Sequence, residues 1–364
     1  MAWKVRRTGA AEVPFRIKGK VGRIEDPPPA VFFRKYVEAN RPVVLSGVME
    51  PWPALGRWNP AYLESVAGEH TGEVIVSKNG LYPDYISQPP PMAKVEMRLS
   101  EFLRRAVPPE NQRTAAGEPP PPILAPGETY YIYGKSYLLD AFPALREEIG
   151  APACLGDVPV STNSVWFSSP GCVTPLHYDL PNGLLCQVLG SKQVYLFDPS
   201  QHDLLYPRGR HFPGFDNFER QSQVDIQHPD FGAFPEFRRA EALECTLRQG
   251  DTLFIPSNWF HEVETLELSI SVGFGFAGGT STSELAALSE LFKKLSGGAP
   301  GAVNGMDLFR RAGEGPSGGP TPNLASDPRL MEELMSSPSV QRLLQDPAMM
   351  ESVVRIMTGA SQRS

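Results

Sequence analysis

Several features are scarce or missing in this sequence of 364 residues, and each absence excludes a class of protein. The 4 cysteines show no C-x-x-C spacing, which argues against a disulfide framework or a zinc-binding knuckle. No run of 18 apolar residues occurs, and no apolar signal core follows Arg6 and Arg7, so we expect neither a membrane span nor a secretory leader. The net charge of −7 provides no general attraction to nucleic acid. We therefore expect a cytoplasmic or nuclear protein.

Proline, in contrast, is abundant, with 38 residues. Three runs, at 27–29, 89–91 and 119–122, predict polyproline-like connections at the surface. The hydrophobic content of 41% and the charged content of 21% are typical of a globular protein that buries a core. The length predicts one large domain with an appendage.

The chain divides by its patterning into an N-terminal α/β region, residues 1–160, and a strand-rich core, residues 161–280. In the core, short β-rich stretches are predicted at 163–168, 176–179, 184–189, 193–197, 242–247, 252–255 and 269–276. The segments Leu189–Lys192 and Arg248–Asp251 resemble hairpin turns. So many short strands predict a mainly β (α+β) protein, a double-stranded β-helix of the jelly-roll type with flanking helices and a small helical C-terminal tail.

The C-terminal part is predicted to be helical and separable from the barrel. Residues 281–296 carry an apolar stripe of helical period, typical of a helix that packs on the barrel or forms a homodimer interface. Residues 297–322 are a flexible Gly/Pro-rich linker, and 323–360 form a short helical module in which an Asp-Pro start occurs twice. The methionine-rich part, 327–357, resembles the STI1 or DP modules of co-chaperones, which implies a chaperone or hydrophobic-helix partner; the alternative is a tail without a partner.

The sequence Thr-Pro-Leu-His-Tyr-Asp contains the first two candidate metal ligands, His177 and Asp179. Residues two apart on a strand direct their side chains to the same face, so both can reach one ion. His261, 84 residues after His177, is the best candidate for a third ligand. Two histidines and one carboxylate form the facial ligand set of non-haem Fe(II) oxygenases. A surface pair on a strand is the alternative interpretation of His-x-Asp alone.

The residues around these ligands resemble the JmjC/cupin-type 2-oxoglutarate oxygenases over about residues 20–280. The motifs that carry the resemblance are Asn163–Gly171, the segment Thr174–Asp179, Leu185–Lys192, and Gln249–Pro256 leading into Trp259, Phe260 and His261. The resemblance implies a cupin barrel that binds Fe(II) and uses 2-oxoglutarate and O₂ as cosubstrates.

The same resemblance implies how the cosubstrate is held. Family members bind the C5-carboxylate of 2-oxoglutarate through a lysine, a threonine and a tyrosine, and Lys192, Thr174 and Tyr131 occupy the matching positions. A cation and two hydroxyl donors suit a carboxylate in a partly dry barrel. Tyr130 and Tyr133 are rivals of Tyr131.

Two positions depart from the family pattern. Where relatives place an asparagine six residues after the first ligand, this chain has Gly183, with Asn182 one step early as the candidate cosubstrate contact. Gly273 stands where many members have another asparagine.

Two branches of the family compete for the substrate. The chain resembles the tRNA wybutosine hydroxylases in length and motifs, which implies a modified tRNA base. The Arg220-Gln221 pair resembles the substrate-contacting pair of the asparaginyl hydroxylase that acts on hypoxia-inducible factor, which implies a protein side chain. Trp259 is a third candidate substrate contact. A non-catalytic cupin scaffold with a chaperone-binding tail is the alternative from another class.

Overall fold

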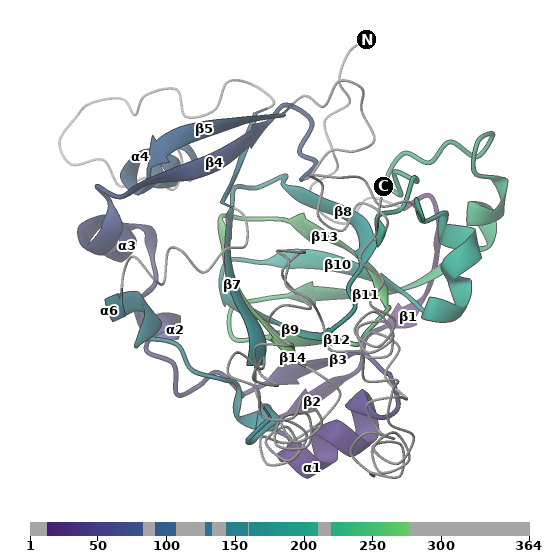
Figure 1. Cartoon of the computed structure of the whole chain (residues 1–364), viewed down its shortest axis with the longest axis horizontal. Helices are drawn as coiled ribbons and strands as arrows, with labels where there is room; N and C mark the ends of the chain where they lie inside the picture. The colour runs from purple at the N-terminus through teal and green to yellow at the C-terminus, as the bar shows by residue number, and fades with distance from the viewer. Residues whose placement is uncertain are drawn as a thin grey trace, which may run out of the picture.

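The fold is built from two β-sheets that face each other, as a computed structural model shows (Figure 1). The structure describes residues 13–82, 92–106, 128–132, 143–158, 160–209 and 220–276. The predicted helix 281–296, linker 297–322 and module 323–360 lie outside the described residues.

Sheet A has five strands, and sheet B has nine. In order across the sheet, sheet A contains β1 (Arg16–Lys20), β11 (Glu241–Leu247), β10 (Lys192–Phe197), β13 (Phe260–Thr265) and β8 (Val173–Tyr178). Sheet B contains β2 (Arg23–Glu25), β3 (Val43–Ser46), β12 (Thr252–Ile255), β9 (Asn182–Leu189), β14 (Ser269–Phe276), β7 (Val160–Ser168), β6 (Thr129–Ile132), β4 (Thr71–Ser77) and β5 (Met92–Arg98).

The helices are short and flank the sheets. They are α1 (Pro29–Phe32), which continues as the π-helical η1 (Phe33–Val37), then α2 (Ala54–Arg57), α3 (Pro60–Ala67), α4 (Leu99–Ala106) and α6 (Pro143–Arg146), with 3₁₀ turns η3 (Ala153–Leu155), η4 (Pro199–Leu205) and η6 (Pro235–Arg239). Asn59 caps α3 by accepting a hydrogen bond from the Tyr62 N–H, and Pro60 follows at the first helical position. No helix among the described residues is long and apolar enough to cross a membrane.

Core strands β7 to β10 alternate between the two sheets, and so do β11 to β14, which confirms the predicted jelly-roll fold. The expected hairpins at Leu189–Lys192 and Arg248–Asp251 are therefore wrong, because β9 and β12 belong to sheet B while β10 and β11 belong to sheet A. Both turns lead the chain across the barrel. Gly190 permits the first crossing, since its φ is +71° and a Cβ there would overlap the carbonyl of Leu268.

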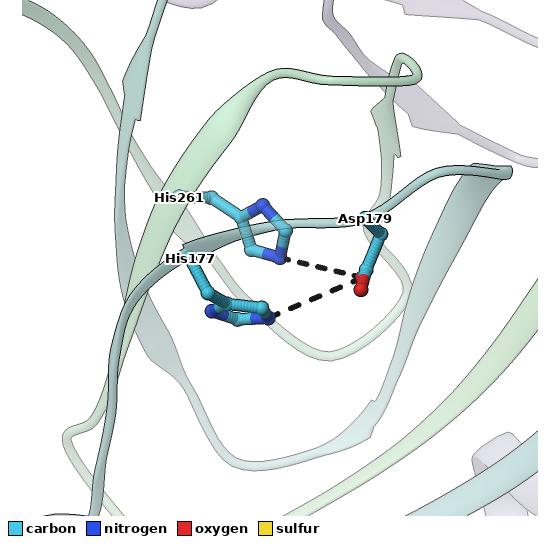
Figure 2. A group of neighbouring side chains, drawn as sticks. All are labelled: His177, Asp179 and His261. Carbon is cyan, nitrogen blue, oxygen red and sulfur yellow. Dashed lines mark ion pairs between the residues drawn. The ribbon is translucent and has the colours of Figure 1, made fainter. Parts of the chain in front are cut away.

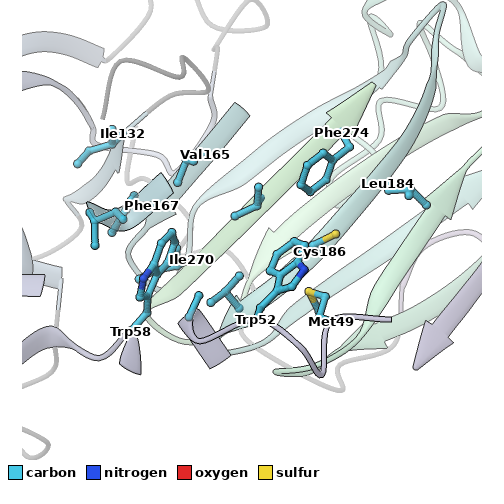
Figure 3. Packing of buried hydrophobic residues seen from close by; sticks show 14 of the residues in the cluster. Met49, Trp52, Trp58, Ile132, Val165, Phe167, Leu184, Cys186, Ile270 and Phe274 are labelled. Carbon is cyan, nitrogen blue, oxygen red and sulfur yellow. The ribbon is translucent and has the colours of Figure 1, made fainter. Parts of the chain in front are cut away.

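The outer face of sheet B carries the largest hydrophobic core (Figure 3). Side chains at alternate positions of β7, β9 and β14, such as Phe167, Leu184 and Phe274, pack there against Trp52 and Trp58 of the N-terminal region. Figure 1 shows α2, α3 and α6 on the side of β7. This packing assigns the opposite face of sheet B to the barrel interior.

Sheet A has the same alternation. Tyr195 and Phe197 of β10 pack outward against Phe15 and Phe237, whereas Val194 and Leu196 pack inward with residues of β11 and β12. Side chains at the same alternate positions of β10 as Val194 and Leu196 therefore line the interior.

The predicted N-terminal region also contributes strands to both sheets, because β1 extends sheet A and β2 to β6 extend sheet B.

A buried carboxylate links the N-terminal helices to the segment that precedes β7. Glu148 is 5% exposed and accepts hydrogen bonds from the Trp58 indole at 2.7 Å, the Tyr62 hydroxyl at 2.6 Å and the Arg57 guanidinium at 2.9 Å. Burial alone would raise the pKa of Glu148, but the bonds from Tyr62, Arg57 and Trp58 lower it below its usual value. The network therefore stabilises the ionised form.

Candidate functional site

The three predicted ligands converge at one point of the barrel interior (Figure 2). One ligand atom from each of His177, Asp179 and His261 lies within 4.8 Å of the others. The Nε2 atoms of His177 and His261 lie 4.0 and 3.9 Å from Asp179 Oδ2, respectively. The structure thus brings together residues 84 positions apart, because β8 and β13 are neighbours and His177 pairs with His261.

Hydrogen bonds to the backbone orient both imidazoles. His177 Nδ1 lies 2.8 Å from the Pro175 carbonyl oxygen, and His261 Nδ1 lies 3.1 Å from that of Trp259. A carbonyl can only accept, so each Nδ1 carries a proton, and in the neutral imidazole Nε2 is then the nitrogen with a lone pair. This tautomer lets Nε2 bind a metal, and the backbone bond at Nδ1 fixes the orientation of each ring.

The site is buried on the histidine side and open on the carboxylate side. The side chains of His261, His177 and Asp179 are 6%, 13% and 47% exposed, respectively. Burial, followed by the proximity of His177, lowers the pKa of His261 to about 4, so this imidazole is neutral near pH 7. A neutral imidazole can bind a metal without first losing a proton.

Asp179 lies one residue beyond the end of β8, whereas the sequence predicted it on the strand. Its position is set by a loop contact instead, because its carbonyl accepts a hydrogen bond from the Asn258 N–H at 2.9 Å. Ser257 donates to the Leu180 carbonyl at 2.6 Å, and Asn182 Oδ1 accepts from the Ser257 N–H at 3.1 Å. The amide oxygen of Asn182, predicted to contact the cosubstrate, is therefore used to hold the turn that precedes His261.

Lys192 lies at the other end of the polar interior. It is 4% exposed and in step with Val194 and Leu196, so its side chain enters the barrel. No hydrogen bond or ion pair to its ammonium occurs within the described part of the chain. Burial lowers its pKa to about 8, an effect that Cys172 partly offsets. A buried cation of this kind calls for an anionic ligand.

Two hydroxyl groups, one from each sheet, also face the barrel interior. Tyr131 Oη lies 3.4 Å from Thr174 Oγ1, and Tyr131 is 5% exposed. Tyr130 faces the outer core, with its hydroxyl near Glu128 and Arg105, and the side chain of Tyr133 lies outside the described residues. The structure therefore places Tyr131, rather than Tyr130, beside Thr174.

A break in the regular pairing of β8 puts Thr174 and His177 on one face. On a regular strand, residues three apart point to opposite faces. Thr174 pairs with Val263 and His177 with His261, so β8 has one residue more than β13 between these pairs. The extra residue has the effect of a β-bulge, which turns both side chains inward.

The other predicted substrate contacts have different surroundings. Gln221 forms an antiparallel bridge with His177, so the two side chains lie on the same face, and Gln221 is 4% exposed. Arg220 precedes it and is partly buried. Trp259 packs in the core between the sheets and donates its indole N–H to the Asn40 carbonyl at 2.9 Å. Its ring is thus used for packing.

Strand β13 and the interior position of Trp166 were missed by sequence reasoning. The acidic residues Glu262 and Glu264 hide the strand pattern, although both are buried. Trp166 alternates with the inward-facing Ser168 and packs on the cluster that contains Tyr131 and Cys172. Strand alternation from Ser168 was the available signal for Trp166.

Comparison with known proteins places this site in a family. The sequence profile of the cupin-like domain matches residues 29–278. Lysine-specific demethylase 8 of Xenopus tropicalis is 32% identical over 66% of this chain and 48% of its own length. Lysine-specific demethylase JMJ30 of Arabidopsis thaliana is 33% identical over 69% and 53%, and human tRNA wybutosine-synthesizing protein 5 is 28% identical over 69% and 76%. The protein therefore belongs to the cupin-like family, in its JmjC branch, and spans about half the length of the demethylases that it matches.

Proposed function

We propose that this protein is an Fe(II)- and 2-oxoglutarate-dependent oxygenase of the JmjC type that hydroxylates a C–H bond. The observation that carries the proposal is the pairing of an inward-facing His-Asp-His group with a buried lysine in one barrel. His177, Asp179 and His261 would hold the metal on one side of its coordination sphere. Iron with 2-oxoglutarate and O₂ supplies the oxidation, in which CO₂ and succinate are released.

The residues present fit both Fe(II) and 2-oxoglutarate. Two Nε2 atoms and one carboxylate oxygen are the donor set that non-haem Fe(II) prefers, and three protein ligands leave room for a chelating cosubstrate. Lys192 would bind the far carboxylate of 2-oxoglutarate, with the hydroxyl groups of Tyr131 and Thr174 as hydrogen-bond donors. The alternative, a cupin scaffold without catalysis, gives no reason to bury a cation opposite such a triad.

For the substrate, a modified tRNA base of the wybutosine type is supported by chain architecture. The chain covers 76% and 70% of the human and Danio rerio proteins named tRNA wybutosine-synthesizing protein 5, more than it covers of the demethylases. With a net charge of −7, binding of tRNA would depend on a local basic surface.

A protein side chain is the second candidate, and the placement of Gln221 favours it. The primary amide of Gln221 offers both donors and an acceptor on the face of His177. Such a group suits an amide or backbone segment next to the metal. The relatives named lysine-specific demethylases are consistent with a protein substrate as well.

Metal binding is tested by anaerobic titration of Fe(II) into the wild type and the Asp179→Ala variant. We expect one ion per chain in the wild type and lost binding in the variant, because two imidazoles alone do not complete the facial set. Unchanged stoichiometry and affinity in Asp179→Ala would refute the ligand assignment.

The reaction is tested by 2-oxoglutarate turnover with tRNA-Phe, ankyrin-repeat peptides and methyl-lysine peptides as separate substrates. Mass spectrometry should show a gain of one oxygen, or loss of a methyl group for the lysine peptides, in one class only. Absence of turnover with every class, including uncoupled succinate formation, would contradict the oxygenase proposal.

A further inference from the structure

Trp166 and Gly273 form a contact in the barrel interior that the proposed chemistry does not by itself require. A Cβ at position 273 would overlap the Cη2 and Cζ3 atoms of the Trp166 ring. The six-membered ring therefore lies directly against the Gly273 backbone. Gly183, the other interior glycine that departs from the family pattern, has only the Ile255 carbonyl oxygen near its Cβ position, at 3.9 Å. The two glycines therefore differ in the space around them.

Strand register places this contact relative to the lysine. Lys192 pairs with Thr265, and Thr265 Oγ1 donates to Ser168 Oγ across the barrel at 3.0 Å. Ser168 in turn pairs with Tyr131. These residues make one layer of the interior, the layer that contains the buried ammonium.

The metal ligands lie further along the same strands, in a separate layer of the interior. Leu196 of β10 pairs with His261, so four residues of β10, about 13 Å of backbone, separate the lysine layer from the metal layer. Trp166 is two residues from Ser168 on β7 and pairs with Ser271. Trp166 therefore occupies the layer between the ammonium and the metal ligands, and its ring extends over Gly273 toward the metal layer.

We propose that the Trp166 ring, seated on Gly273, forms the wall beside the C3–C4 segment of the 2-oxo acid and selects an unsubstituted chain. The inference rests on the proposed function, since a 2-oxo diacid that joins the metal to Lys192 must pass through this middle layer. The absence of a side chain at 273 lets the ring lie back against the sheet. Any side chain at position 273 displaces the Trp166 ring into the space between the metal ligands and Lys192.

The first test compares Gly273→Ala with Gly183→Ala, which adds the same methyl group at an interior site with ordinary clearance. Binding of 2-oxoglutarate to the Mn(II)-loaded protein is measured by calorimetry without O₂. We expect at least tenfold weaker binding for Gly273→Ala, unchanged binding for Gly183→Ala, and recovery in the double variant Gly273→Ala with Trp166→Ala. Mn(II) affinity should be the same in all of them.

The second test uses Trp166→Ala alone, which does not depend on whether Gly273→Ala folds. Wild type should bind 3-methyl-2-oxoglutarate at least tenfold more weakly than 2-oxoglutarate, and the variant should bind the two within about threefold. Equal discrimination by both proteins, or full affinity in a folded Gly273→Ala, would overturn the inference. If the wild type itself bound no 2-oxoglutarate, the proposed function would fail instead, so the two failures are distinguishable.

Discussion

Replacement of Lys192 by methionine separates a cosubstrate-binding lysine from a structural one. Methionine has a similar length and no charge, so it fills the same space in the barrel. In the free protein Lys192 is 4% exposed, and burial lowers the pKa of its ammonium from 10.5 to about 8. The wild type thus buries a charge that no partner among the described residues compensates. Lys192→Met should remove this cost.

The sign of the effect follows from the lowered pKa. Between about pH 8 and 10.5 the unfolded chain keeps the proton that the folded protein has lost, so the free energy of unfolding rises with pH across this window. At pH 7 both states are protonated, and the penalty is fully present. A difference of roughly 2.5 pKa units corresponds to about 3 kcal/mol, an upper limit for the gain in Lys192→Met.

The same substitution should weaken cosubstrate binding. Removing one partner of a buried charge pair costs about 2–5 kcal/mol, which corresponds to an affinity loss between about 30-fold and several-thousand-fold. Iron binding should be unaffected, because Lys192 and His261 lie on different strands and the middle layer of the interior separates them.

Thermal unfolding at pH 7 and pH 10, with and without 2-oxoglutarate, is the assay. Without ligand at pH 7, the wild type should be less stable than Lys192→Met, and this difference should disappear toward pH 10. Addition of 2-oxoglutarate should stabilise the wild type but not the variant. A variant that is less stable than the wild type at pH 7 and still binds 2-oxoglutarate with full affinity would refute the reasoning.

Two further predictions concern other parts of the chain. Glu148→Ala should lower the free energy of unfolding by about 2–3 kcal/mol, because the buried Trp58 indole loses its acceptor. Because the pKa of Glu148 is lowered in the folded protein, its contribution to stability is present above its pKa in the unfolded chain and is lost as the pH falls through its pKa in the folded protein. The stabilities of wild type and variant should therefore converge at acidic pH. Truncation after Gly319 should leave iron binding and turnover near normal and abolish capture of a chaperone or hydrophobic partner through 327–357. A substantial drop in melting temperature, or a halved mass on size exclusion, would show instead that the tail packs on the barrel or completes a dimer.

The sequence was sufficient to predict most of the core strands and the meeting of three candidate metal ligands, but not the connections between the strands. Strand positions follow from alternation and β-branched residues, which are local properties. The Gly190 turn illustrates the limit, since a Leu-Gly-Ser-Lys sequence specifies a sharp change of direction and not the sheet that receives the next strand. The predicted hairpin failed because this choice is made by packing between the sheets.

Strand β13 shows a second limit. Glu262 and Glu264 are 1% and 5% exposed, although glutamate normally marks a solvent-facing position. Glu262 accepts a hydrogen bond from Gln227, at 3.0 Å, from the segment between β10 and β11. The burial of this face therefore depends on a segment that is distant in sequence, and periodicity alone could not reveal it.

The arrangement of the candidate site depends on register more than on local spacing. A strand with regular pairing would put Thr174 and His177 on opposite faces, and the threonine hydroxyl could not reach Tyr131. The extra residue in β8 turns both inward, so one short segment contributes to the metal layer and to the middle layer next to Tyr131. Trp166, on β7 of the other sheet, lies in the same middle layer. A change that restores regular pairing, such as deletion of Pro175, should therefore disrupt metal and cosubstrate binding together, although no ligand is removed.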